Sequence, residues 1–465
     1  MIELLSDPEQ KVRKAAISTS IKVNSPEIIY ALIDNLANPV YSNQAMSTLV
    51  LIGGKALQHL ENAFYRSGQL TQTILRIVQV IGRIGGQRAK DLLWSKIDYP
   101  DKVVVSQVLL SLGECGFKAG ISQITRIKYA IENDIADIAW NLNAIQEIVE
   151  EPENKQVKNS LEEEDRHDIE HIYMLLAMLY DTRSIQLVKE NIESGTSEGT
   201  TYAVELLDVF LSEQLKVRVI PILDDLTSIE KINRLEIFYP RIKLDNKLVL
   251  KFLINRDFTQ SNRWTKACAL EQIGRLKISD FKLDLIAQLF NPDRLLREMA
   301  GWALYQIDPA EYEINSSRFS EDIKRWLDRA VISDKQTKLK LFDKIIFFKK
   351  LPIFEGIPGI ALSFLADISR EMRLASDQFV PIDEKVNNDF FIVFSGSVQY
   401  YESSRYAMDY TSGQFVGEMI SRVGFANSNL LITKEETILL KINKDQFYEL
   451  LADNVKLADR VLEYL

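Results

Sequence analysis

The chain of 465 residues has few of the side chains on which catalysis and cross-linking usually depend. Its two cysteines, Cys115 and Cys268, lie far apart in apolar helical patterns, which predicts buried free thiols in a reducing compartment. Three histidines leave little general acid–base capacity near neutral pH. The sequence also has no Walker loop, no G-x-S-x-G motif and no C-x-x-C pair. We therefore expect a protein that is not an enzyme.

The chain also lacks a basic block and a long apolar run. Its net charge of −10 argues against a nucleic-acid partner, because binding by counterion release requires a concentrated basic face. The longest apolar run, at 172–180, is far shorter than the ~20 residues that cross a bilayer. The N-terminus is charged from its third residue. We expect no membrane span, no secretory leader and a cytoplasmic location.

What the sequence does contain is an internal repeat. Pro8, Pro39 and Pro100 lie 31 and 61 residues apart, and Leu70 takes the corresponding place in the copy between the last two. Each copy continues with about fourteen residues whose apolar side chains recur every third or fourth position, which predicts an amphipathic helix. Other periodic stretches lie between the copies, so each unit is predicted to be a helix pair.

The pattern returns at 262–276 and 291–307. Since one helix pair cannot bury its own apolar face, such units stack into a superhelix. These residues, with the stretch "DPEQKVRKAA" at 7–16, resemble HEAT repeats. The resemblance implies a mostly α protein with a HEAT-type α-α solenoid over residues 1–335. We predict that five residues are buried between stacked helix pairs: Ala15, Ala45, Val108, Ala267 and Ala300.

An acidic, linker-like stretch near 150–166 interrupts the repeats. It contains the run Glu162, Glu163, Glu164 and Asp165, which we interpret as the solvated start of a helix.

The stretch "HDIEH" that follows fits the H-x-x-E-H pattern of inverted zinc peptidases. In that pattern His167 and His171 share one helix face and Glu170 is the base. Zinc requires a third protein ligand and an open fourth position. The remaining histidine, His59, lies in a different repeat, and nothing marks a downstream carboxylate such as Glu205 as a ligand. We therefore predict no metal site and no catalytic residue.

Near residue 350 the apolar period changes from 3.6 to 2. The run "FFIVFSGSVQYYE" at 390–402 contains two strand-like segments on either side of Ser395-Gly396, which predicts a β-hairpin. We therefore expect a small β-roll or jelly-roll domain over 345–465. Two further strands and a terminal helical region are predicted at 378–383, 437–442 and 444–465.

This segment resembles the cyclic-nucleotide-binding domain of the catabolite activator protein and of the kinase regulatory subunits. "LPIF" matches the entry helix of that family, "FIVFSGSV" its hairpin, "SGQFVGEM" its phosphate cassette and "ILLKINKDQFYELL" its last strand and closing helix. The resemblance implies that helix-start N–H groups and an arginine bind the cyclic phosphate, and that a glutamate binds the ribose 2′-hydroxyl.

The cassette differs from that of the family at the position of the arginine. Gly417 and Glu418 match the glycine and glutamate, but the arginine position is Asn427. The turn at 383–389 also lacks its usual glycines, and Arg422 stands where it can pair with Glu418 at i+4. We expect a vestigial site and no cofactor, with cyclic AMP and cyclic GMP as the disfavoured alternatives. Its residues are Gly417, Glu418, Met419, Asn427 and Ser428.

The two parts together resemble the cytosolic part of bacterial carriers related to ATP/ADP translocases. The resemblance implies a protein partner or a carrier domain of the same chain, at the inner membrane. We expect a regulatory or scaffold module that binds proteins through the solenoid. The alternative is a nucleotide sensor that regulates the solenoid or an attached carrier.

Overall fold

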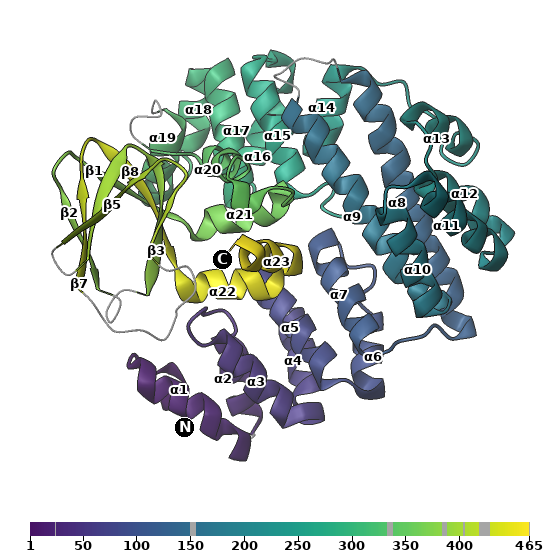
Figure 1. Ribbon diagram of the computed structural model, residues 1–465, viewed down its shortest axis with the longest axis horizontal. Helices are drawn as coiled ribbons and strands as arrows, with labels where there is room; N and C mark the ends of the chain where they lie inside the picture. Colours follow the sequence, from purple (N-terminus) through teal and green to yellow (C-terminus); the bar gives the residue numbers. More distant parts are fainter. Residues whose placement is uncertain are drawn as a thin grey trace. The chain divides into compact units, whose positions relative to one another are not determined.

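The computed structural model describes residues 1–23, 25–148, 155–332, 338–383, 388–402, 405–417 and 428–464. The chain divides into two compact units, Met1–Gln272 and Ile273–Leu465. In its described part the first unit is helical, whereas the second contains helices and two antiparallel sheets (Figure 1). The division lies inside a helix, before the boundary between 335 and 345 that the sequence predicts, and that boundary stays a prediction. Among the described residues, no helix is both long enough and apolar enough to cross a membrane.

In the first part of the chain, most helices pack on the next helix but one. Their bounds are α1 Gln10–Thr19, α2 Pro26–Asn35, α3 Ser42–Ile52, α4 Leu57–Phe64, α5 Thr71–Ile84, α6 Gly86–Trp94, α7 Lys102–Glu114, α8 Ile121–Glu147 and α9 Lys155–Leu179. The odd-numbered helices pack in the order α1, α3, α5, α7 and α9, while α2 packs on α4 and α4 on α6. The buried apolar side chains form one continuous core from Leu5 to Leu235.

The predicted helix starts are confirmed. Pro8, Pro39 and Pro100 lie just before α1, α3 and α7, and Leu70 is the N-cap of α5. Because proline lacks the amide hydrogen that a helix interior requires, it marks the residues before the first turn. In the described part of residues 1–330 every regular element is a helix, as predicted.

One of the predicted buried residues is wrong. Ala15 is exposed, and Ala16 and Ile17 are the buried residues of α1. Lys11 and Thr19, one turn to either side of Ala15, are polar and exposed, so Ala15 lies on the solvent stripe of its helix. The other four are buried as predicted: Ala45, Val108, Ala267 and Ala300. Cys268 is also buried as predicted, whereas the Cys115 thiol is half-buried and donates to the carbonyl of Gly82 at 3.1 Å.

The remaining helices of the first unit follow α9. Their bounds are α10 Thr182–Glu193, α11 Ser197–Phe210, α12 Glu213–Leu223, α13 Ser228–Leu235, α14 Asn246–Asn255 and α15 Arg263–Arg275, the last of which crosses the division. α12, α13 and α14 pack on α8, so this long helix has neighbours on several sides.

Helices of the second unit precede and follow its sheets. Their bounds are α16 Lys282–Leu289, α17 Arg294–Ile307, α18 Pro309–Ser316, α19 Glu321–Val331, α20 Leu341–Phe348, α21 Gly359–Ile368, α22 Lys444–Asp453 and α23 Val455–Tyr464. α17 packs on α16, α18, α19 and α20. The buried Glu298 of α17 accepts a hydrogen bond from the backbone N–H of Leu341 at 2.7 Å, and this bond fixes the start of α20.

Eight strands form two sheets with the orders β1-β8-β3-β6 and β2-β7-β4-β5. Their bounds are β1 Arg370–Leu374, β2 Phe379–Asp383, β3 Asp389–Ser395, β4 Ser397–Glu402, β5 Arg405–Thr411, β6 Phe415–Val416, β7 Ser428–Thr433 and β8 Thr437–Asn443. Buried side chains of both sheets share one core: Phe391, Val393, Val416 and Leu439 from the first, and Val380, Val398 and Leu431 from the second. This strand order is that of a jelly roll, as predicted.

The predicted hairpin at Ser395-Gly396 is wrong, although both strands exist. β3 pairs with β6 and β8, whereas β4 pairs with β5 and β7 in the other sheet. Gly396 joins them with a φ of 82°, and a Cβ there would lie 2.5 Å from Oγ1 of Thr437. The glycine therefore carries the chain from one sheet to the other, past the start of β8.

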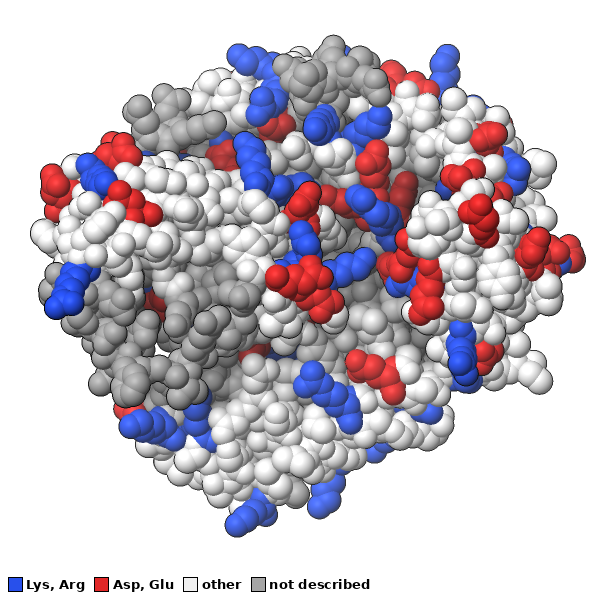
Figure 2. Space-filling model, viewed as in Figure 1, with Lys and Arg blue, Asp and Glu red and all other residues white. Residues whose placement is uncertain are grey.

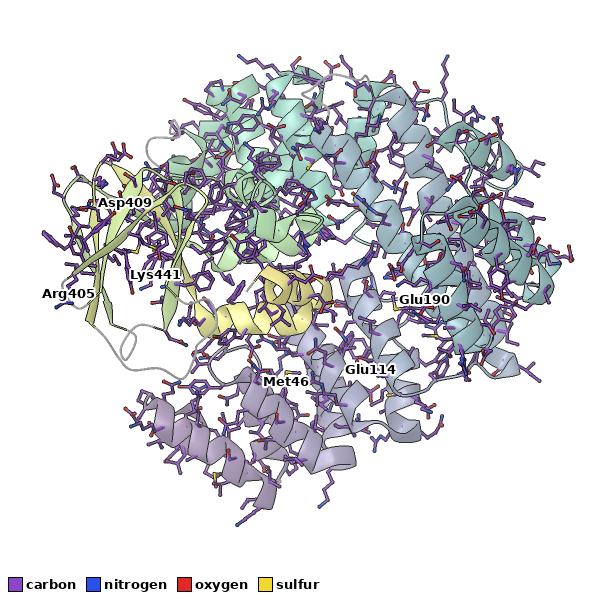
Figure 3. All side chains as sticks on the ribbon, in the orientation of Figure 1. Met46, Glu114, Glu190, Arg405, Asp409 and Lys441 are labelled. Atoms are coloured by element: carbon purple, nitrogen blue, oxygen red, sulfur yellow. The ribbon has the colours of Figure 1, made fainter. Side chains whose placement is uncertain are left out.

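Two lysines on or next to the strands pair with aspartates. Lys434, just after β7, lies with its Nζ 2.6 Å from Oδ2 of Asp409 on β5, and Lys441 Nζ lies 2.8 Å from Oδ2 of Asp389. Figure 3 labels Asp409 and Lys441 among the side chains. On the face that Figure 2 shows, basic and acidic side chains of the described residues are interspersed.

Candidate functional site

The predicted phosphate cassette lies largely outside the described residues. Gly417, at the end of β6, has a φ of 88°, a left-handed conformation that favours glycine. Ser428 is the first residue of β7. Glu418, Met419 and Asn427, with Arg422, lie outside the described part, as does most of the 383–389 turn. β6 and β7 belong to different sheets, so the cassette sequence joins the two sheets. Its role as a vestigial site stays a prediction.

The two histidines of the "HDIEH" stretch share a hydroxyl. His167 and His171 lie one turn apart on α9, with ring centroids 4.4 Å apart. Their Nε2 atoms lie 2.8 and 2.6 Å from Oγ of Ser106 on α7, and that hydroxyl is 2.9 Å from the carbonyl oxygen of Lys102. Both histidines can donate from Nε2 to Ser106 while its hydroxyl donates to the carbonyl, an assignment that follows from the network.

A third possible metal ligand does converge on the histidines, which the sequence analysis missed. One ligand atom each from His167, Asp168 and His171 lies within 4.8 Å of the others. The carboxylate is Asp168, inside the motif, rather than a downstream residue such as the exposed Glu205. Glu170, the base of the peptidase pattern, instead pairs with Lys189 Nζ at 2.6 Å. The peptidase arrangement is therefore absent from these described residues.

Asp168 already has a cation. Its side chain has no exposed surface, and Oδ1 lies 2.5 Å from Nζ of Lys102, the first residue of α7. Burial is the largest effect and raises the pKa of Asp168, but Lys102 and His167 together lower it by more, and the net shift is downward. Burial likewise lowers the pKa of Lys102, yet Asp168 and Asp137 raise it above its ordinary value. The two side chains are thus an ion pair at neutral pH, and the ammonium already neutralises the carboxylate that a metal would need.

Further charges from α8 and from the loop before α15 surround this ion pair. Asp137 lies 3.4 Å from Lys102 Nζ and 2.9 Å from Nη2 of Arg256, whose guanidinium stacks 4.0 Å from the ring centre of Trp140. Asn141 accepts from Arg256 at 3.3 Å and donates to Asp165 at 2.8 Å. These contacts connect α7, α8, α9 and the loop.

The interpretation of the acidic run as a solvated helix start is wrong for part of its length. It lies within α9, where Glu164 is only 2% exposed and accepts from the backbone N–H of Asn262 at 2.8 Å. Burial raises the pKa of Glu164 and of Asp165. A signal was present in the sequence, because Glu164 and Asp168 continue the apolar stripe that Val157 and Leu161 begin.

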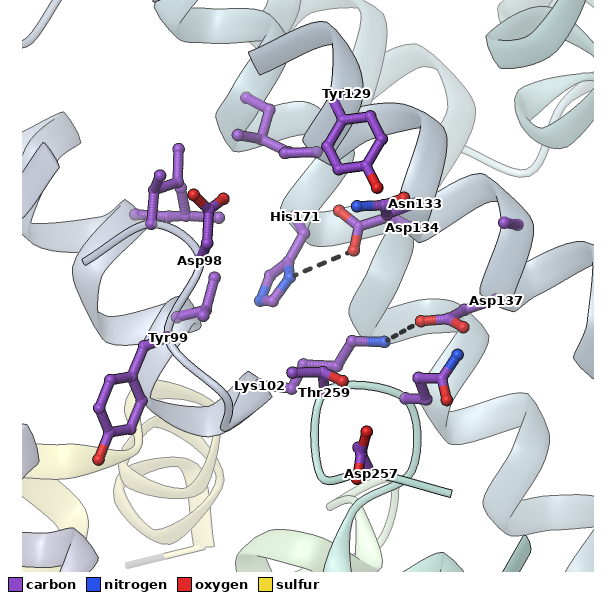
Figure 4. Close-up of a pocket in the computed structure, with 17 residues that line it drawn as sticks. Asp98, Tyr99, Lys102, Tyr129, Asn133, Asp134, Asp137, His171, Asp257 and Thr259 are labelled. Atoms are coloured by element: carbon purple, nitrogen blue, oxygen red, sulfur yellow. Dashed lines mark hydrogen bonds and ion pairs between the residues drawn. The ribbon is translucent and has the colours of Figure 1, made fainter. Parts of the chain in front are cut away.

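Burial sets the protonation states of two further groups. It lowers the pKa of His171 to about 4, so this imidazole is neutral at pH 7. It raises the pKa of Asp134 on α8 to about 8, with Asp168 as the next cause. Asp134 Oδ1 lies 3.9 Å from Nδ1 of His171 (Figure 4). At neutral pH a mostly protonated carboxyl therefore faces a neutral histidine.

A pocket of about 480 Å³ lies beside this cluster, within the first unit. Figure 4 shows carboxylates reaching it from three places: Asp98 before α7, Asp134 and Asp137 on α8, and Asp257 on the loop before α15. The other residues that line it are Ile97, Tyr99, Lys102, Val105, Leu109, Tyr129, Ala130, Asn133, Ala136, His171, Leu175, Thr259 and Gln260.

The described groups of the cluster are engaged with one another. Ser106 bonds to two histidines and a carbonyl, Lys102 is an ion-paired ammonium, and Glu170 pairs with Lys189. A nucleophile requires an adjacent free base, and a catalytic metal requires an open coordination position. The arrangement is therefore suited to joining α7, α8 and α9 beside the pocket.

Comparison with known proteins gives weak likenesses. No protein-family model matches the chain, and no curated protein matches it. Among solved structures, the regulatory domain of Toxoplasma gondii protein kinase A with cAMP has a TM-score of 0.24 and 18% identity, over 30% of this chain and 56% of that chain. The regulatory subunit of a cAMP-independent protein kinase A from Trypanosoma brucei has a TM-score of 0.23 and 18% identity, over 26% and 47%.

A cyclic-nucleotide-binding-like protein from Brucella abortus has a TM-score of 0.19 and 17% identity, over 24% of this chain and 98% of that chain. These neighbours are thus cyclic-nucleotide-binding domains that cover a quarter to a third of the chain, and the chain spans about half the length of the kinase subunits. TM-scores at this level do not establish a shared fold.

Proposed function

We propose that the protein is a non-enzymatic regulatory module that acts by binding proteins. The observation that carries the proposal is the strand order of the jelly roll. In it β6 and β7, on either side of the cassette sequence, belong to different sheets, so that this sequence connects the two sheets of the domain. The arginine that would bind a cyclic phosphate is replaced by Asn427, so the domain acts through its surface rather than through a bound nucleotide.

The helical part supplies the binding surface in this proposal. The odd-numbered helices pack on one another in sequence from α1 to α9, which supports the proposal that they form a HEAT-type solenoid. The partner is another protein, or a carrier domain of the kind that the sequence resemblance implies, at the cytoplasmic face of the inner membrane. A binding role is favoured over a catalytic one because three polar side chains are already held in hydrogen bonds or ion pairs: Ser106, Lys102 and Glu170.

The alternative function is that of a nucleotide sensor. Gly417 favours it, because it has a left-handed backbone, and glycine serves where such a backbone approaches a ligand closely. In a sensor, cyclic nucleotide would bind after β6, and helices α22 and α23 would close on the domain. Arg422 would then be the cation that replaces the missing arginine.

Isothermal titration calorimetry with cyclic AMP, cyclic GMP and ATP separates the two functions. The regulatory module predicts no binding tighter than about 1 mM, since losing a buried charge-assisted pair typically costs ~2–5 kcal/mol. Binding below about 10 µM would establish the sensor instead. In that case Arg422→Ala should abolish it, and a Lys434→Ala variant, which removes an exposed cation on the same domain, should leave it unchanged.

A further inference from the structure

The pocket in the first unit is lined by four carboxyl groups and one lysine. Two of the four carboxyl groups are paired. Asp137 contacts Arg256 and Lys102, and Asp98 lies 2.5 Å from Nη2 of Arg126. The lysine, Lys102, is held by Asp168 behind the wall. The pocket therefore offers more acceptors than cations.

The other two carboxyl groups make no ion pair with a lysine or arginine in the described residues, although Lys102 acts on Asp134 and Lys266 on Asp257 from a greater distance. Asp134 makes no ion pair with a lysine or arginine there, and its recorded contact is with His171 at 3.9 Å. Its side chain is 13% exposed, so it is mostly withdrawn from water yet open to the pocket. Asp257, on the loop before α15, is exposed and lies across the pocket from α8 (Figure 4). A ligand that enters meets the carboxyl of Asp134, which is mostly protonated at neutral pH, and the carboxylate of Asp257.

The walls between these carboxylates are apolar and aromatic. The lining includes Val105 and Leu109 of α7, Leu175 of α9 and the rings of Tyr99 and Tyr129. An aliphatic stem can pack against such walls while a charged head reaches the carboxylates. Tyrosine faces also attract ammonium and guanidinium groups.

We propose that this pocket binds an organic cation, an ammonium or guanidinium group on an aliphatic stem, with Asp134 and Asp257 as its acceptors. The cation comes either from a lysine or arginine side chain of a protein partner or from a free alkylamine. If the cation belongs to a protein partner, this inference rests on the proposed function and specifies how that partner binds. Binding of a small amine does not depend on the proposed function. An anion is disfavoured by four carboxylates, and a metal at the adjacent histidines by the ammonium of Lys102.

The test uses the full chain and defined probes. Nα-acetyl-lysine methylamide, its Nε-acetylated form and 1,4-diaminobutane are titrated by calorimetry and by chemical-shift changes of the tyrosine rings. Asp134→Asn and Asp257→Asn remove one acceptor each. Glu114→Gln is the matched control, because it removes an exposed carboxylate at the far end of α7 that does not line the pocket (Figure 3).

We expect the lysine derivative, the diamine or both to bind with a Kd below about 1 mM, and each Asp variant to weaken that binding at least tenfold, or about 1.4 kcal/mol. Binding of the lysine derivative alone would identify the ligand as a side chain of a protein partner. Binding of the diamine alone would identify it as a free amine. Equal binding of the Nε-acetylated form, no binding by any probe, or unchanged affinity in Asp257→Asn would overturn the proposal. None of these results depends on the nucleotide titration that tests the proposed function.

Discussion

Replacement of Lys102 by methionine tests whether the buried cluster joins α7 to α8 and α9. In the native chain the Lys102 side chain is 6% exposed and its ammonium lies 2.5 Å from Asp168 and 3.4 Å from Asp137. Methionine has a similar length and no charge. Asp137 keeps Arg256 as a partner, but in the described residues Asp168 is left with His167, whose Nδ1 lies 3.9 Å away, as its basic neighbour.

The expected loss of stability follows from the buried charge that remains on Asp168. Removing one partner of a buried ion pair typically costs about 3–5 kcal/mol, because the other charge stays buried without compensation. Asp168 has no exposed surface, so water does not reduce this cost. Hydrogen exchange measured on peptides of α7, α8 and α9 reports local opening, and its rate should rise about a hundredfold or more in Lys102→Met.

The matched control is Lys96→Met, which removes another buried ammonium. Lys96 lies over the rings of Phe64 and Tyr65, and its hydrogen bonds are to Leu92 and Ser95 rather than to a carboxylate. Its loss should cost less than about 1 kcal/mol, and Lys102→Met combined with Asp168→Leu should recover most of the stability. Equal exchange in the two single variants would refute the assignment of Lys102 as the cation of the cluster.

Three further outcomes are expected. Elemental analysis of the purified protein should find no stoichiometric zinc, because Lys102 neutralises Asp168 and Ser106 engages both histidines; one equivalent that is lost in His171→Ala would contradict this. The carboxyl of Asp134 has a pKa of about 8 when folded and an ordinary value of 3.8, so the folded state binds more protons between these values and its stability falls as pH rises. Urea unfolding should therefore show Asp134→Asn gaining stability relative to wild type from pH 6 to 8, by up to about 1.4 kcal/mol per pH unit, and a constant difference would disprove it. Gly396→Ala should destabilise the jelly roll by about 1–3 kcal/mol in thermal unfolding, whereas Gly54→Ala, where a Cβ would meet nothing within 4 Å, should be nearly neutral.

The kinds of secondary structure could be predicted from the sequence, because they depend on local periodicity. Proline before an apolar 3.6-residue period correctly marked α1, α3 and α7, and alternation marked β2 and β8. Strand pairing could not be predicted in the same way. Ser395-Gly396 is a local turn signal, but the partners of β3 and β4 lie elsewhere in the chain, and packing against them separated the two strands.

The buried cluster was missed for a related reason. Acidic residues usually face solvent, and a run such as 162–165 is most simply interpreted that way. The helical stripe of Val157, Leu161 and Glu164 could have indicated burial. No pattern in the sequence identifies Lys102 as the partner of Asp168, because that contact depends on how α7 packs on α9.

The most direct test of the proposed function is a side-by-side titration of cyclic AMP into the wild-type chain and Asn427→Arg. The variant restores the guanidinium at the position where the sequence resemblance places it. The account predicts negligible binding to wild type at micromolar concentrations and a gain of about thirtyfold or more in the variant, which corresponds to about 2 kcal/mol from one charge-assisted pair. Wild-type binding below about 10 µM, with no gain in Asn427→Arg, would contradict it and identify a working nucleotide sensor.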